Sequence, residues 1–153
     1  MLDTLTYPVS TSGSALKLKY AYQSGILQSI TDVLDSPNVM VWQANAVNPA
    51  GQITQQTLGN GLVASRAYDA VTHWLASVQS GPGGGASIQN QSFLYDEIGN
   101  VSQRQDNNRG LSENFYYDND CRLSYSTLNG SQNLSLNYNL MGNITSRSDV
   151  ASG

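Results

Sequence analysis

The segment FLYDEIGNVSQR, residues 93–104, decides how this sequence is interpreted. Phe93 and Tyr95 are two positions apart, so their side chains share one face of an extended strand. Asp96 is a residue type whose carboxylate accepts hydrogen bonds from the N–H groups of a turn, and Gly99 supplies the positive φ that such a turn needs. The last residues, VSQR, fit a return strand. The segment therefore predicts a strand, a turn and a second, antiparallel strand.

The same pattern recurs along the chain in steps of 21 to 27 residues. Six copies align on one marker position, which holds tyrosine in five copies and valine in the other. The markers are Tyr22, Val47, Tyr68, Tyr95, Tyr117 and Tyr138. Self-similarity at such a period is the sequence signature of a repeat protein. We therefore treat residues 1–153 as a single repeat region.

Turn signals follow the markers and also lie between the copies. A glycine follows the marker in four copies, which we interpret as one shared turn shape: Gly25, Gly51, Gly99 and Gly142. The copies at Tyr68 and Tyr117 lack this glycine. Asn129-Gly130 is a strong hairpin signal between two copies. The stretch SGPGGGAS, residues 80–87, is expected to be an enlarged flexible loop. The pattern predicts an all-β fold, an antiparallel meander of about twelve short strands that form successive hairpins of a curved repeat sheet.

Composition agrees with this fold and excludes several kinds of partner. Only 12% of the residues are charged, about half the usual share, and nine tyrosines stand against two phenylalanines. The net charge is -4 and the basic residues are scattered, so no nucleic-acid partner is expected. No apolar run is long enough for a membrane span, and the N-terminal MLDTLTYPVS lacks the features of a signal peptide. A single cysteine excludes an internal disulfide framework.

Few residues suggest chemistry, and each has a structural interpretation that we prefer. His73 is the only histidine and has no nucleophile or metal-ligand companion at a recognisable spacing. Cys121 is expected to be a buried or incidental thiol. Asp118 and Asp120 fail the EF-hand pattern, and Asp96 with the acidic residue after it fits a turn better than a glycosidase pair. No cofactor and no enzymatic activity are therefore predicted.

The tyrosines leave two alternatives open. They could form an aromatic platform for glycans, or they could pack copy against copy as the interior of the repeat stack. We prefer the packing role. Aromatic residues exposed on one face would favour the platform, whereas a uniformly buried tyrosine ladder would count against it.

Two adjacent copies carry a resemblance to a known group of proteins. The motif YDxxGNxxxR at Tyr95 alternates with FxYDxxxRL at Phe115, and this alternation resembles the Rhs, or YD-repeat, proteins. That group includes bacterial polymorphic toxins, toxin-complex C components, wall-associated proteins and teneurins. The resemblance is strong over residues 66–147 and weak before them. The repeat-signature residues, all assigned a structural role, are Tyr22, Gly25, Gly51, Tyr68, Asp69, Tyr95, Asp96, Gly99, Asn100, Arg104, Tyr117, Asp118, Arg122, Leu123, Tyr138, Gly142, Asn143 and Arg147.

The resemblance implies a spiral β-sheet that wraps into a hollow shell, which in toxin members encloses a toxic domain. We expect a structural segment of such a shell, which encapsulates or presents a toxin or effector domain not contained in this chain. Its partners would be the rest of a larger YD-repeat polypeptide and the enclosed cargo domain, secreted or at the cell surface. The capping core of the toxins, with its Asp-Pro motifs, has no counterpart in the sequence, so we interpret the chain as an excerpt or a short orphan. The alternative is a cell-surface repeat module that binds glycan or protein.

Overall fold

The computed structural model describes residues 2–11, 13, 15–34 and 37–149, and the other positions of the expected repeat region lie outside the described residues. Within these residues the chain forms thirteen strands of a single sheet. The strands are β1 (Thr4–Thr6), β2 (Lys17–Gln23), β3 (Ile26–Asp32), β4 (Val39–Val47), β5 (Ile53–Leu58), β6 (Leu62–Tyr68), β7 (Leu75–Pro82), β8 (Gln89–Tyr95), β9 (Val101–Asp106), β10 (Leu111–Tyr117), β11 (Leu123–Leu128), β12 (Ser131–Tyr138) and β13 (Ile144–Arg147).

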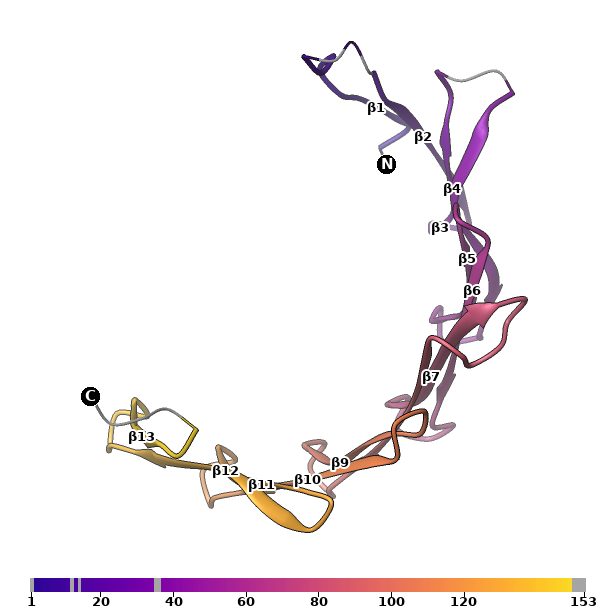
Figure 1. Cartoon of the computed structure of the whole chain (residues 1–153). Helices are drawn as coiled ribbons and strands as arrows, with labels where there is room; N and C mark the ends of the chain where they lie inside the picture. Colours follow the sequence, from indigo (N-terminus) through magenta and orange to yellow (C-terminus); the bar gives the residue numbers. More distant parts are fainter. Residues whose placement is uncertain (1, 12, 14, 35–36, 150–153) are drawn as a thin grey trace.

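The sheet is an open antiparallel meander. Each strand pairs only with the strands before and after it in the sequence, so the order in the sheet is the order in the chain. Figure 1 shows the sheet bent into an arc, with the two termini at its opposite ends. The predicted fold class is confirmed. The additional strand is β1, which precedes the first copy and pairs with β2.

A β-bulge accompanies each of the six markers, and this feature was not visible in the sequence. Leu94 pairs with Gln103, but Tyr95 pairs with Val101, so Ser102 is an extra residue on the partner strand. The pairing shifts at the marker in the same way in the other five copies. A bulge bends its strand and increases the local twist. A bend repeated at a fixed interval agrees with the curvature of the arc.

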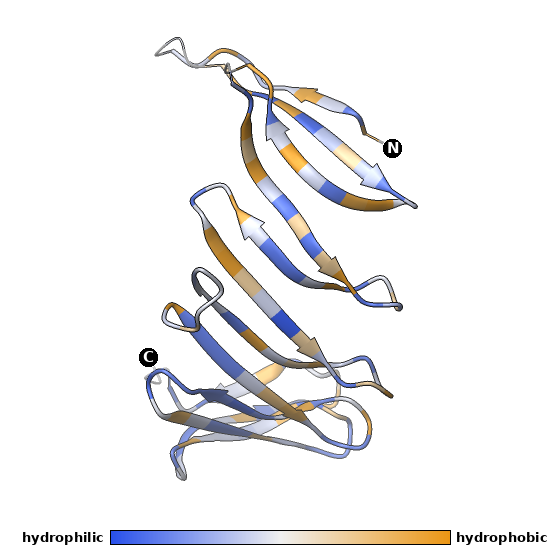
Figure 2. Ribbon diagram, turned by 90° about the vertical axis from the view of Figure 1, so that its right-hand side faces the viewer, coloured by the Kyte–Doolittle hydropathy of each residue, from blue (hydrophilic) through white to orange (hydrophobic). Residues whose placement is uncertain are grey.

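The two faces of the sheet differ in chemistry, as the alternation of side chains along each strand requires. The tyrosine face carries the marker tyrosines together with apolar residues such as Phe93 and Phe115. The amide face carries a series of hydrogen bonds between side chains on neighbouring strands, such as Gln103 to Asn114 (3.0 Å) and Asn137 to Ser146 (2.7 Å). Figure 2 shows hydrophobic and hydrophilic residues alternating along the strands.

The core is sparse for a chain of this length. The buried apolar residues are Ala44, Ala64 and Val78, and no side chain in the described residues is completely buried. The pairing register places all three on the tyrosine face, together with the buried Ser126. Stable domains bury an apolar sheet face against a second layer. The single-layer arc leaves that face only half covered.

The loop expected over residues 80–87 is shorter than predicted. Strand β7 continues through Gly81 and Pro82, and only residues 83–88 lie between β7 and β8. A Cβ on Gly81 would lie 2.7 Å from the carbonyl oxygen of Gly85 and 2.9 Å from Oγ of Ser87. Gly81 therefore provides space for a loop that folds back onto its own strand. The glycine content of the segment does not distinguish this role from a flexible loop.

The turn at Gly25 also differs from the prediction of a shared shape. Gln23 pairs with Ile26, so only Ser24 (φ 49°) and Gly25 (φ 83°) connect β2 to β3. Positive φ at both central residues is the geometry of a two-residue type I′ hairpin. The turns after the later markers are longer, so Gly25 is not equivalent to Gly51, Gly99 and Gly142.

Candidate functional site

The most regular feature of the molecule is one rim of the sheet, where each even-numbered strand from β4 to β12 ends at its marker and a turn follows. An aspartate or asparagine comes directly after the marker in all five turns: Asn48, Asp69, Asp96, Asp118 and Asn139. In each turn its Oδ1 accepts the backbone N–H two residues later. In every turn except that of Asp69, it also accepts the N–H four residues later. We refer to this edge as the Asx rim.

The turn at Asp96 shows the electrostatics of this arrangement. Its Oδ1 accepts the backbone N–H of Asn100 at 2.8 Å, and its Oδ2 accepts the side-chain amide of the same residue at 2.9 Å. Burial acts to raise the pKa of Asp96, but the hydrogen bonds from Asn100 and Ile98 outweigh it and hold the pKa below its ordinary value. In the turn after Tyr68, which is one residue longer than the others, the backbone N–H groups of Thr72 and Val71 lower the pKa of Asp69. The folded turns thus favour ionised carboxylates.

Each Asx turn contains a residue with positive φ, but that residue is not always glycine. Gly99 has φ 94°, whereas Cys121, at the equivalent place, has φ 60°. His73 also has φ 60°, in the turn that is one residue longer. The sequence prediction therefore missed two members of one turn class. Cys121 is exposed, so the alternative of a buried thiol is wrong.

The marker tyrosines form a ladder of hydrogen bonds along the tyrosine face. Four hydroxyl groups each donate to a backbone carbonyl at the first residue of the preceding strand, so each tyrosine joins the start of one strand to the end of the next. The pairs are Tyr68 to Ile53 (3.4 Å), Tyr95 to Leu75 (2.9 Å), Tyr117 to Val101 (2.8 Å) and Tyr138 to Leu123 (2.8 Å). Burial, with a smaller contribution from Asp96, raises the pKa of Tyr117, so this donor stays protonated.

The two copies without a turn glycine contribute a bulky side chain that covers the tyrosine of the following copy. The ring of Trp74 packs against that of Tyr95, with the centroids 5.1 Å apart. The guanidinium of Arg122 lies 4.7 Å from the ring centroid of Tyr138 and forms ion pairs with Asp118 (2.8 Å) and Asp120 (3.1 Å). The copies that lack the turn glycine therefore supply the side chain that covers a tyrosine, and the copies that follow them supply the tyrosine that is covered.

Gly99 has a second role that follows from this packing. A Cβ at Gly99 would lie 2.9 Å from the ring of Trp74, which is closer than carbon atoms approach in folded proteins. Consecutive turns are also linked by Gln52, whose side-chain amide donates to the carbonyl of His73 at 2.9 Å. These contacts join the turn after Val47 to the turn after Tyr68, and the turn after Tyr68 to the turn after Tyr95.

The remaining predicted residues lie along the strands that leave this rim, as Arg104 in β9 and Arg147 in β13 do, or in its last turn. Arg104 pairs with Glu113 across two strands, with Nε 2.6 Å from the carboxylate, and lies 6.0 Å from the ring centroid of Phe115. Arg147 donates to Asp149 at 2.7 Å. The backbone carbonyl of Asn143 accepts the N–H of Asn139 and closes the last Asx turn.

The geometry bears on the alternative of an aromatic platform. The marker tyrosines from Tyr68 onward are half-buried, and their hydroxyl groups are engaged within the chain, which counts against that alternative. Tyr116, on the amide face, is 41% exposed and stacks on Tyr125 with the ring centroids 4.2 Å apart. Among the described residues, no three His, Cys, Asp or Glu side chains come together as a metal site, and no helix could cross a membrane.

Comparison with known proteins rests on the fold. The sequence matches no protein-family model and no curated protein. The crystal structure of TcdB2-TccC3-Cdc42 superposes on 97% of this chain with a TM-score of 0.73 and 16% sequence identity. The structure of the Photorhabdus luminescens Tc holotoxin pore carrying TccC3-D651A superposes on 94% of it with a TM-score of 0.72 and 15% identity. In both cases the chain spans only 9% of the length of the chain it matches.

The class defined by these observations is an open, single-layer antiparallel repeat sheet. The particular likeness is to a segment of TcdB2-TccC3, over nearly the whole of this chain. The resemblance to the Rhs, or YD-repeat, group that includes toxin-complex C components is confirmed at the level of the fold. At this sequence identity the match establishes the fold of the chain and not its role.

Proposed function

We propose that the chain is a wall segment of a hollow β-shell that encloses or presents a toxin or effector domain not contained in this chain. One observation carries this proposal: a curved sheet of a single layer has the same fold as part of TcdB2-TccC3. A wall of this kind acts through its shape and needs no catalytic residue.

The uneven coverage of the two faces supports the proposal. The amide side chains satisfy one another on one face, whereas the apolar side chains of the tyrosine face are only half covered. An isolated arc cannot bury that face, because each hairpin contacts only its neighbours. A closed shell supplies a protected space on one side of the sheet.

The test compares two neighbouring residues that point to opposite faces. Arg104 lies on the tyrosine face and Gln105 on the amide face of β9, and both are exposed in the arc. Arg104→Cys and Gln105→Cys are each made in a Cys121→Asn background, because asparagine tolerates positive φ. Labelling with a bulky maleimide-polyethylene glycol is then measured in the complete polypeptide encoded by the gene.

A wall segment requires that one of the two cysteines is strongly protected in the folded polypeptide and that both react fully after unfolding. Equal rapid labelling of both cysteines in the folded polypeptide contradicts the proposal, because neither face would then enclose a space.

The open edges carry a related expectation for the isolated chain. β1 and β13 each expose one side of their backbone to solvent, and unpaired strand edges promote association. We propose that isolated chains pair edge to edge. Sedimentation velocity at increasing concentration measures this, and a strictly monomeric chain at about 1 mM would contradict it, since unpaired strand edges promote association at micromolar to millimolar concentrations.

A further inference from the structure

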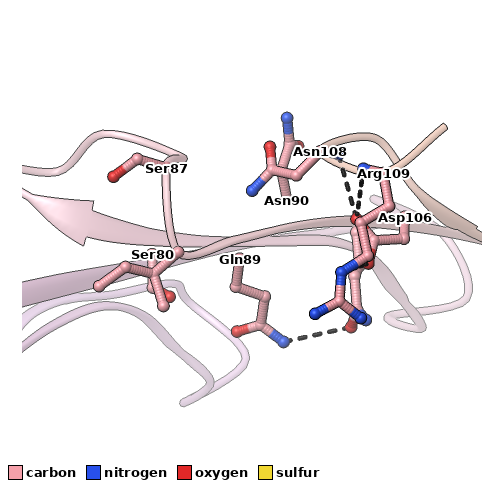
Figure 3. Close-up of a pocket in the computed structure, with 9 residues that line it drawn as sticks. Ser80, Ser87, Gln89, Asn90, Asp106, Asn108 and Arg109 are labelled. Carbon is pink, nitrogen blue, oxygen red and sulfur yellow. Dashed lines mark hydrogen bonds and ion pairs between the residues drawn. The ribbon is translucent and has the colours of Figure 1, made fainter.

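A polar pocket lies at the rim opposite the Asx rim. Its cavity volume is about 510 Å³, and its walls come from the loop between β7 and β8, the first residues of β8 and the turn after β9. Figure 3 shows Ser87, Gln89 and Asn108 around it, with Asp106 and Arg109 at one end. Pockets that bind small molecules commonly have volumes of about 300 to 1,000 Å³.

The pocket results from an insertion into the repeat. The step from Tyr68 to Tyr95 is the longest of the series, at 27 residues. The additional residues form the loop over residues 83–88. In repeat proteins, insertions into single repeats map to loops and often supply the binding face.

The loop is held in place by hydrogen bonds. The N–H of Ile88 donates to the carbonyl of Ser80 at 3.0 Å, and the N–H of Gly85 donates to that of Pro82 at 3.1 Å. The side-chain amide of Asn108, in the next turn, donates to the carbonyl of Ala86 at 2.7 Å. A site held in this way loses little conformational entropy when a ligand binds.

The lining is rich in side chains that carry both hydrogen-bond donors and acceptors. The amide side chains of Gln89, Asn90, Gln91 and Asn108 line the pocket together with two serine hydroxyls. Some of these groups are engaged within the chain, because Gln89 donates to Oε1 of Gln91 at 3.1 Å and Oδ1 of Asn90 accepts from Asn107 at 3.3 Å, while the amide nitrogens of Gln91 and Asn90 remain as donors. Asp106 accepts the backbone N–H of Asn108 (3.1 Å) and Arg109 (3.2 Å), and its second carboxylate oxygen lies 3.9 Å from Nε of Arg109. The side chain of Arg109 is 77% exposed, so its terminal N–H groups are accessible to a ligand.

These groups fit a neutral ligand with several hydroxyl groups. An amide presents a donor and an acceptor side by side, which matches neighbouring hydroxyls, and a carboxylate adds a strong acceptor. Asp106 balances the charge of Arg109, so an anion gains little. Ile88, 59% exposed on the wall, offers an apolar surface for the C–H face of a sugar ring. We propose that this pocket binds a neutral saccharide in its pyranose form, independently of the shell role.

Saturation-transfer difference NMR tests the proposal on the full chain, because the method detects weak binding of small molecules directly. The probes are methyl α-D-glucopyranoside, methyl β-D-galactopyranoside and N-acetylglucosamine, each titrated separately. At least one probe is expected to receive saturation on its ring protons with a millimolar Kd. Arg109→Ala is expected to weaken that binding by about tenfold, the effect of losing one good hydrogen bond, and Asn108→Ala by at least as much, because it also removes the hydrogen bond to the carbonyl of Ala86.

Asn60→Ala is the matched control, because Asn60 lies in a turn at the same rim but outside the pocket. Far-UV circular dichroism checks that each variant is folded. If Asn108→Ala does not fold, Arg109→Ala still tests the proposal, because the side chain that it removes is exposed. Absence of transfer to all three probes overturns the proposal, as does equal binding by Arg109→Ala and the control. Displacement of the sugar by an equal concentration of inorganic phosphate would assign an anion site to Arg109 and also overturn it.

Discussion

The two halves of the arc use the same backbone pattern with different side-chain support. From β6 onward, each marker tyrosine donates its hydroxyl to the preceding strand, and Trp74 and Arg122 cover two of the rings. In the first half, Val47 has no hydroxyl, and Tyr22 is 37% exposed and makes no hydroxyl hydrogen bond within the described part of the chain. The bulge at the marker is present in both halves. The meander therefore does not need the tyrosine ladder, and we expect the ladder to add stability to the second half.

The largest expected effect comes from Gly99→Ala. The substitution places a Cβ 2.9 Å from the ring of Trp74 and forces a side chain onto a residue with φ 94°. We expect a loss of about 2 to 3 kcal/mol of unfolding free energy, which urea titration measures. Gly61→Ala is the control, because it shares the positive φ but has open space around it, and it should cost only about 1 kcal/mol. Equal losses would show that the Trp74 contact is unimportant.

Removal of one hydroxyl tests the ladder directly. Tyr95→Phe leaves the carbonyl of Leu75 without its donor, and we expect a loss of about 1 kcal/mol. Tyr22→Phe should change the unfolding free energy by only a few tenths of a kcal/mol, since Tyr22 is exposed and its hydroxyl makes no hydrogen bond within the described residues. If the two variants lose the same stability, the proposed difference between the halves is wrong.

Extension of the ladder into the first half is the complementary experiment. Val47 pairs with Ile53 as Tyr68 pairs with Leu75, so Val47→Tyr should direct a hydroxyl toward the first residues of β3. We expect a gain of about 0.5 to 1 kcal/mol and slower amide hydrogen exchange in β3, measured by mass spectrometry. Val47→Phe is the control that adds the ring without the hydroxyl, and an equal gain from it would assign the effect to ring packing.

The smallest expected effect concerns pH and compares the Asp turns with the Asn turns. The pKa of Asp96 is lowered in the folded chain from its ordinary value of 3.8. Its contribution to stability is therefore present above that value and is lost as the pH falls through the lowered one. The pKa values of Asp69 and Asp118 are lowered as well, chiefly by backbone N–H groups, so acidification below about pH 4 should weaken all three turns.

Asp96→Asn copies the turns of Asn48 and Asn139, which do not titrate. The fall in thermal midpoint from pH 5 to pH 2.5 should be smaller for this variant than for the unchanged chain. An identical fall would show that the Asp96 carboxylate does not contribute to acid sensitivity.

Much of the fold followed from the marker spacing and the hairpin signals. FLYDEIGN by itself predicts a strand and a turn, and its recurrence predicts a meander whose strands pair in order. The cap that Asp96 provides was also predictable, because the chemistry of an Asx turn is local. Cys121 at positive φ was not predictable, because the preference for glycine at such a place is only statistical.

The sequence by itself determined the all-β class, the period and the turn residues, because each depends on interactions within a few residues along the chain. Only the tertiary structure decided the bulge at every marker, the carbonyl to which each tyrosine donates and the packing of Trp74 against Gly99. These features depend on which residues of neighbouring strands lie opposite one another. A shift of one residue in register changes every such pair, and the alternation of polar and apolar residues does not specify where a bulge falls.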